Sequence, residues 1–114
     1  MPTLPKAPLD RRMDTLRALQ VIPGVGPSLA HDLFVLGIRQ VSDLKQKDPE
    51  KLYRRLEVHV GQKVDRCVLY VFREAVYFAK TPKPQPEQLK WWNWQDTSLT
   101  SAQTAFLRRT AKLS

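Results

Sequence analysis

The sequence predicts an all-α protein: a compact domain of about five helices, with a Pro/Trp-rich segment folded over it and a basic C-terminal helix or tail. Three observations lead to this fold class. Apolar residues recur every three or four positions through most of the chain, which is the period of a helix face. Capping residues precede several of these segments, and glycine follows some of them. Two of the segments meet at a short turn rich in glycine and proline.

We expect four regions along the 114 residues. A flexible lead-in with three prolines covers residues 1–9, and the helical domain covers residues 10–80. A Pro/Trp-rich extension over residues 81–96 and a basic C-terminal helix or tail over residues 97–114 follow. A chain of this length can bury one modest core but not two independent ones.

The first two helices are expected over residues 11–20 and 27–36, with Asp10 as the cap of the first and Gly37 just after the second. The sequence Ile-Pro-Gly-Val-Gly-Pro joins them over residues 22–27, and we call it the hairpin. Its first proline cannot continue a helix, its glycines adopt backbone angles closed to other residues, and its last proline suits a first helical turn. The segment therefore predicts a helix, a tight turn and a second helix.

The amino end of the second helix predicts a phosphate site. The first N–H groups of a helix lack intrahelical acceptors and lie at the positive end of its dipole, and residues without side chains let a bulky anion approach them. Gly24, Val25 and Gly26 are expected to offer main-chain N–H groups, and Ser28 a hydroxyl. The alternative is a hairpin that only joins and packs the two helices.

The hairpin and its flanks resemble the helix-hairpin-helix family of DNA-binding motifs, through Leu19, residues 23–27, Ala30 and Leu33. In that family the hairpin holds the DNA backbone without reading its sequence, sometimes with a cation bound to hairpin carbonyls. The resemblance therefore implies non-sequence-specific binding of double-stranded or structured DNA. A monovalent cation at the hairpin is the one cofactor that it suggests.

One feature departs from the motif, because Ser28 and Leu29 stand where many members have Lys or Arg. We expect nearby arginines to supply the missing positive charge, namely Arg12, Arg17 and Arg39.

The net charge of +8 favours a polyanionic partner such as DNA. The first 20 residues carry a net +2, residues 21–79 also a net +2, and residues 80–114 a net +4, so the core is almost balanced. No apolar run is long enough to cross a bilayer, no signal peptide is recognisable, and a single cysteine fits a reducing compartment. We expect a cytoplasmic, bacterial protein with no membrane partner.

Three further helices are expected in the domain. Ser42 is expected to cap a short one over residues 43–46, and Asp48 a longer one that ends before Gly61. Asp65 is expected to cap the longest helix, over residues 66–80, against which the others pack.

Cys67 falls in the first turn of that longest helix, where an exposed thiol would have a lowered pKa. We expect a buried structural cysteine instead. The spacing of the cysteine and the two histidines fits no zinc pattern, and no grouping of nucleophile and base is signalled, so no catalytic or metal residue is predicted. The protein is not expected to be an enzyme.

The extension begins with three prolines spaced by single residues, which favour an extended chain. Trp91, Trp92 and Trp94 follow, and at least two of them are expected to fold back over the core. The alternative is a stacking platform for exposed bases. Thr97 or Ser98 is expected to cap a last helix whose basic residues are Arg108, Arg109 and Lys112.

Residues 65–79 and the segment Leu-Lys-Trp-Trp-Asn-Trp at 89–94 resemble the small bacterial "pathogenicity locus" family, also labelled mitomycin resistance or helix-hairpin-helix domain-containing proteins. The similarity runs from about Leu16 to Asp96. It implies DNA binding through the hairpin, in DNA repair or damage resistance, and no reaction. The rival hypothesis is a protein-interaction adaptor with a purely structural hairpin, which would use the three tryptophans or the C-terminal tail.

Overall fold

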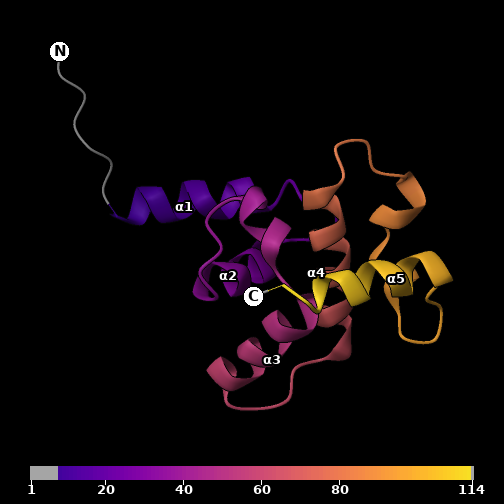
Figure 1. Cartoon of the computed structure of the whole chain (residues 1–114). Coiled ribbons are helices and arrows are strands. Elements are labelled where there is room, and N and C mark those ends of the chain that lie inside the picture. The colour runs from indigo at the N-terminus through magenta and orange to yellow at the C-terminus, as the bar shows by residue number, and fades with distance from the viewer. Residues whose placement is uncertain (1–7, 114) are drawn as a thin grey trace.

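Every regular element among the described residues is helical (Figure 1), which confirms the all-α prediction. The computed structural model describes residues 8–113, with side chains from Arg11 onward. The α-helices are α1 (Pro8–Leu19), α2 (Pro27–Val35), α3 (Pro49–Val60), α4 (Arg66–Lys80) and α5 (Ser101–Thr110). Three short 3-10 helices complete the set: η1 (Val41–Gln46), η2 (Pro86–Leu89) and η3 (Trp91–Trp94). The predicted lead-in lies outside the described residues, except for its last two residues, which belong to α1.

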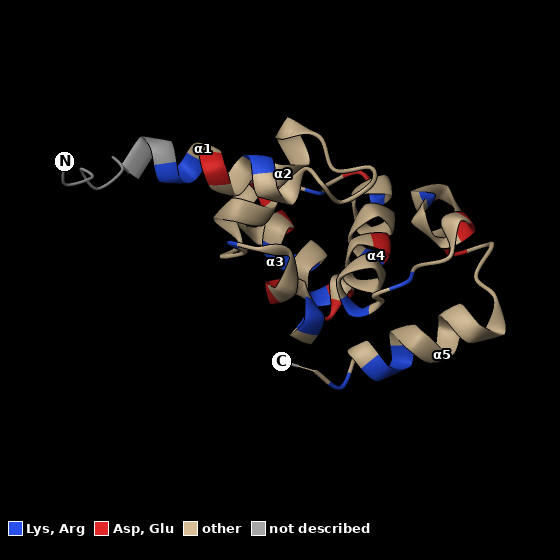
Figure 2. Ribbon diagram, turned by 90° about the horizontal axis from the view of Figure 1, so that it is seen from above, with Lys and Arg blue, Asp and Glu red and all other residues tan. Residues whose placement is uncertain are grey.

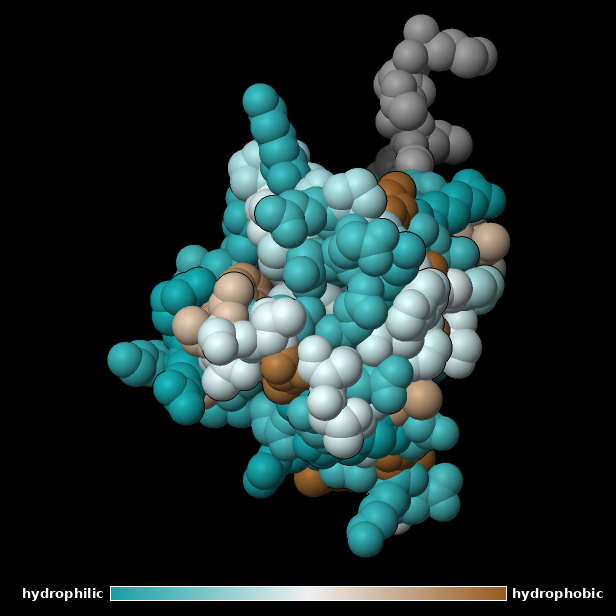
Figure 3. Space-filling view, turned by 90° about the vertical axis from the view of Figure 1, so that its right-hand side faces the viewer, coloured by the Kyte–Doolittle hydropathy of each residue, from teal (hydrophilic) through white to brown (hydrophobic). Residues whose placement is uncertain are grey.

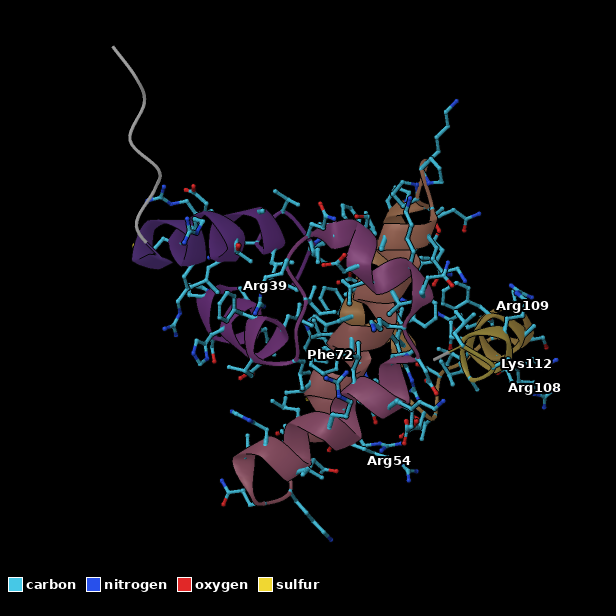
Figure 4. The ribbon with its side chains drawn as sticks, turned by 60° about the vertical axis from the view of Figure 1, so that its left-hand side comes forward. Arg39, Arg54, Phe72, Arg108, Arg109 and Lys112 are labelled. Carbon is cyan, nitrogen blue, oxygen red and sulfur yellow. The ribbon has the colours of Figure 1, made fainter. Side chains whose placement is uncertain are left out.

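Helix α4 is the centre of the fold, as predicted. Its apolar residues are buried on more than one side, and α3, η1, η2 and η3 all contact it. Phe72 lies in the middle of this core and is fully buried (Figure 4). Helices α1 and α2 pack against each other, and the α1–α2 pair joins the core through Leu19, Ile22 and Leu33.

The predicted caps of α3 and α4 are confirmed. The Asp48 carboxylate accepts the Glu50 N–H at 2.9 Å, and the Asp65 carboxylate accepts the Cys67 N–H at 2.8 Å. Gly61 ends α3 with a φ of +82°, in the left-handed region where glycine is favoured. These short-range signals act within a few residues, which is why the sequence alone locates them.

The predicted caps of the first helix and of η1 are wrong. Helix α1 begins at Pro8, so Asp10 lies inside it; the fixed φ of proline suits the first helical turn. Gln40, not Ser42, precedes η1, and its N–H donates to the Asp43 carboxylate at 3.2 Å.

The predicted start of the last helix is also wrong. Neither Thr97 nor Ser98 caps α5, because Thr100 does so. The Thr100 hydroxyl accepts the Gln103 N–H at 3.1 Å, and the Gln103 side chain accepts the Thr100 N–H at 2.8 Å. This reciprocal pair is a capping box, and it satisfies two donors at once.

The Pro/Trp-rich segment folds back over α4, as predicted. Trp94 is 1% exposed, and its indole N–H donates to the Gln88 carbonyl at 2.9 Å. Trp91 also packs against the core, whereas Trp92 is 49% exposed. The Trp94 ring contacts Phe106 of α5 at a centroid distance of 5.8 Å, so α5 packs against this segment.

Two arginines of α4 hold the end of this segment. Arg66 donates to Asp96 at 2.9 Å, and Arg73 donates to Asp96 and to the Trp94 carbonyl at 2.9 and 2.8 Å. The hydrogen bonds from Arg66, and then from Arg73, lower the pKa of Asp96 to about 2. The carboxylate is therefore ionised at neutral pH, and its ion pairs with Arg66 and Arg73 hold residues 94–96 against α4.

Helices long and apolar enough to cross a bilayer do not occur in the part of the chain that the structure describes.

Candidate functional site

The hairpin is a closed turn on one side and an open helix end on the other. Gly24 has a φ of +81°, in the left-handed region that favours glycine. The Val25 N–H donates to the Ile22 carbonyl at 3.1 Å, and the Val25 side chain is buried in the core. Val25 therefore anchors the turn, and its N–H is already used within it.

The open side is the amino end of α2. Gly26 precedes this helix and offers no side-chain cap, and the first turn holds no acidic residue. A Cβ placed on Gly26 would have no neighbouring atom within 4 Å, and Ser28 is exposed. Helices α3, α4 and α5, by contrast, each begin with a side chain that accepts a first-turn N–H. The structure thus leaves the amino end of α2 accessible to an anion.

The closed side of the hairpin rests on α4 and on the tryptophan segment. A Cβ placed on Gly24 would lie 3.3 Å from Glu74 Oε1, 3.3 Å from Trp91 Cδ1 and 3.9 Å from Val71 Cγ1. Glycine is therefore favoured at position 24 by its positive φ, and a Cβ there would also crowd Glu74 and Trp91.

Glu74 is a feature that sequence reasoning missed. Its side chain is fully buried, and neither carboxylate oxygen has a hydrogen-bond partner among the described residues. Burial raises the pKa of Glu74 to about 9, so the neutral acid prevails at pH 7. The available signal was one acidic residue inside an apolar stretch of α4, directly before Ala75 and Val76.

Two of the three predicted arginines come together, but not at the hairpin. The guanidinium carbons of Arg12 and Arg39 lie 5.4 and 3.9 Å from the centroid of the Phe34 ring. Arg39 also donates to the Phe34 carbonyl at 2.7 Å. Arg12 and Arg39, which we call the arginine pair, border a hollow of about 310 Å³ that Arg11 and Thr15 also line.

The arginine pair lies at the other end of the α1–α2 pair from the hairpin. Arg12 is seven residues before Leu19, which corresponds to roughly 10 Å along the helix axis. Arg17 is exposed in the last turn of α1 and is nearer to the hairpin in sequence. The three predicted arginines therefore extend along the helix pair and do not surround the hairpin.

The basic residues of the C-terminal tail form a separate region. Lys and Arg residues stand out on α1 and at the carboxyl end of α5 (Figure 2). Arg108, Arg109 and Lys112 lie at one edge of the molecule, and Arg39 lies across α4 from them, beside α1 and α2 (Figure 4). The Lys51 ammonium group donates to the Leu113 carbonyl at 3.2 Å, so the tail is held against α3.

The prediction of a buried Cys67 is wrong, because the thiol is exposed. Its pKa is also raised, since the Asp65 side chain hydrogen-bonds the thiol and places a negative charge beside it. This local carboxylate outweighs the effect of the helix dipole on which the sequence argument relied. Across the described residues, no three His, Cys, Asp or Glu side chains are grouped as metal ligands.

Comparison with known proteins gives one family and one relative. The family model described as "pathogenicity locus" matches residues 12–99. The relative, "Mitomycin resistance protein McrB" of Streptomyces lavendulae, is 32% identical over 76 residues, which cover 67% of this chain and 69% of the relative. No solved structure matches the chain.

Proposed function

The chain belongs to the pathogenicity locus family, and from this premise and the geometry of the hairpin we propose that it binds DNA through the phosphate backbone. The DNA is double-stranded or structured, and its sequence is not read. The proposal is one of binding and includes no reaction. A DNA partner suits a family with a relative named for mitomycin resistance, and it implies a cytoplasmic location.

The observation that carries the proposal is the uncapped amino end of α2. Its first-turn N–H groups, the Ser28 hydroxyl and the dipole of α2 all favour a negative oxygen there. The open surroundings of Gly26 let a phosphate group approach the main chain without a clash. The first-turn amides that follow Gly26 are not among those predicted to bind DNA, but they suit this role better than the predicted amide of Val25, which already donates to the Ile22 carbonyl.

The arginine pair supplies a second contact in this proposal. Its distance of roughly 10 Å from the hairpin end of α1 equals the rise of about three base pairs along the axis of duplex DNA. Phe34 holds both guanidinium groups by cation–π contact, so little freedom is lost when they bind a phosphate. Arg17 lies between these two points and adds attraction at longer range.

Ser28→Glu tests the hairpin contact, because it places a carboxylate where the phosphate would bind. We expect the affinity for a short labelled duplex, measured by fluorescence anisotropy, to fall by about tenfold or more from charge repulsion. The stability of the protein should not fall, because an acidic residue in the first turn stabilises a helix by about 0.3–1 kcal/mol.

Ser101→Glu is the matched control. It adds the same charge to the first turn of α5, which Thr100 already caps, and it should leave most of the affinity intact. The salt dependence of binding is a second test. If the protein contacts two or three phosphates, the logarithm of the association constant should fall with the logarithm of the salt concentration, with a slope of about −2 to −3 between about 50 and 200 mM. Absence of binding at the lower salt, or binding indifferent to salt, would contradict the proposal.

The adaptor hypothesis is favoured by one observation, the exposure of Trp92. This ring stands edge-on against Trp91, with centroids 5.7 Å apart and planes at 87°. On the side of the molecule that carries α5, however, the most hydrophobic residues form small separate spots (Figure 3). The surface offered to a protein partner there is limited, which makes the adaptor the second candidate. It predicts no duplex binding at low salt.

A further inference from the structure

A hollow of about 350 Å³ opens between the hairpin, α2, α4 and η3, and we call it the hairpin hollow. It is lined by Gly24, Ser28, Leu29, Asp32, Cys67, Val68, Val71 and Trp91. Gly24 and Ser28 belong both to this hollow and to the region of the proposed phosphate contact. Whatever occupies the hollow therefore lies next to a phosphate bound at the amino end of α2.

One wall of the hairpin hollow is an aromatic ring held in place. Trp91 is partly buried against the core, its Cδ1 approaches the Cβ position of Gly24 to 3.3 Å, and Trp92 supports it edge-on. The neighbouring lining residues Leu29, Val68 and Val71 are apolar. This combination of a fixed indole and aliphatic side chains suits a flat aromatic group.

The carboxyl groups at the hairpin hollow favour a group with N–H donors over a phosphate. Asp32 contributes a half-buried carboxyl, and burial raises its pKa against the opposing effect of His31 and His59. Glu74, fully buried and without a hydrogen-bond partner among the described residues, lies directly behind the wall at Gly24. Carboxyl groups accept hydrogen bonds from the exocyclic amino groups of DNA bases, and an ionised carboxylate repels a phosphate.

We propose that the hairpin hollow receives one unpaired DNA base, stacked against Trp91, beside the backbone phosphate held at the amino end of α2. This inference rests on the proposed function and names its substrate: DNA with an extrahelical or single-stranded base is preferred to continuous duplex. A base that carries an amino group, such as cytosine or adenine, fits Asp32 better than thymine does. An unpaired base enters at the least cost, because it has no pairing to lose.

Three short duplexes test the inference: one continuous, one with a single-adenine bulge and one with an abasic bulge at the same position. The abasic bulge has the same flexibility but lacks the base. We expect the adenine bulge to bind roughly 5- to 100-fold more tightly than the abasic bulge, which is the range for stacking one base on an aromatic side chain. With 2-aminopurine as the bulged base, binding should quench its fluorescence. Trp91→Leu should abolish the quenching, and Trp91→Phe, which keeps an aromatic ring for stacking, should retain part of it.

Cys67 offers a way to block the hairpin hollow without disturbing Trp91. It is the one cysteine of the sequence, it is exposed, and it lines the hollow. Labelling with N-ethylmaleimide, at mildly alkaline pH because the thiol pKa is raised, should remove the preference for the adenine bulge and retain binding of continuous duplex. Cys67→Ser treated with the same reagent is the control.

The outcomes separate the two proposals. Equal affinity for the adenine and abasic bulges, or a preference that survives complete labelling of Cys67, overturns the base-binding inference and leaves duplex binding in place. Failure to bind any of the three duplexes at low salt overturns the proposed function itself.

Discussion

Replacement of Glu74 by methionine should stabilise the protein, and the gain should grow as the pH rises. Burial raises the pKa of Glu74 from 4.5 to about 9, so the folded state retains a proton that the unfolded state releases between these values. The free energy of unfolding of the native protein therefore falls as the pH rises through this window, and the loss is complete above pH 9. Methionine has a similar size and length, carries no charge and removes this dependence.

The magnitude follows from the difference between the two pKa values. Each pH unit within the window corresponds to at most about 1.4 kcal/mol. At pH 7 the variant should be more stable by up to about 3 kcal/mol, and between about pH 5.5 and 8.5 its advantage should grow by up to about 4 kcal/mol. Local relaxation and water entry reduce these upper limits, but they do not change the sign.

Urea denaturation of both proteins at three pH values measures this effect. The other ionisable groups are common to both proteins, so their contributions largely cancel in the difference between the two free energies of unfolding. A difference that stays constant with pH would refute the reasoning, as would a variant less stable than the native protein at pH 8.5. Either result would mean that Glu74 has a partner in solution.

Two further predictions concern the hairpin and the end of the tryptophan segment. Gly24→Ala should destabilise the fold by about 1–2 kcal/mol in thermal unfolding, because the φ of residue 24 is positive and the new Cβ would crowd Glu74 and Trp91. Gly26→Ala is the control and should change the stability much less. Equal losses of stability in the two variants would contradict the geometry of the hairpin. Asp96→Asn should destabilise the protein at neutral pH, because the carboxylate pKa is lowered from 3.8 to about 2 by its bonds to Arg66 and Arg73. The difference in the free energy of unfolding between the native protein and the variant is present above pH 4 and should shrink as the pH falls towards 2. Urea denaturation measures it, and the same difference at pH 7 and at pH 2.5 would contradict the role of this ion pair.

The helices could be predicted where the signal is local. Asp48 followed by Pro49 and Asp65 before the apolar stretch of α4 locate two helix starts, because capping acts within three residues. The last helix could have been located by the same reasoning. Thr100 and Gln103 have the spacing of a capping box, but Thr97 and Ser98 are also capping residues and offered a competing choice.

The candidate site was less accessible to sequence reasoning, because it depends on contacts between distant segments. Gly24 packs against Glu74 and Trp91, which lie 50 and 67 positions further along the chain. No periodic pattern indicates that these side chains meet. Cys67 shows the same difficulty, since one residue on a broadly apolar helix can face either the core or solvent.

The capping of α3 limits how many DNA contacts one copy of the protein can make. Together η1 and α3 repeat the layout of α1 and α2, but the Asp48 carboxylate occupies the amino end of α3 where a phosphate would otherwise bind. In the proposed function the described starts of helices α2 to α5 therefore supply one phosphate contact per chain, and dissociation needs only that helix-end contact to open. Two chains joined by a flexible linker would be bivalent, and their avidity could exceed that of one chain by about 10² to 10⁴ without any new contact.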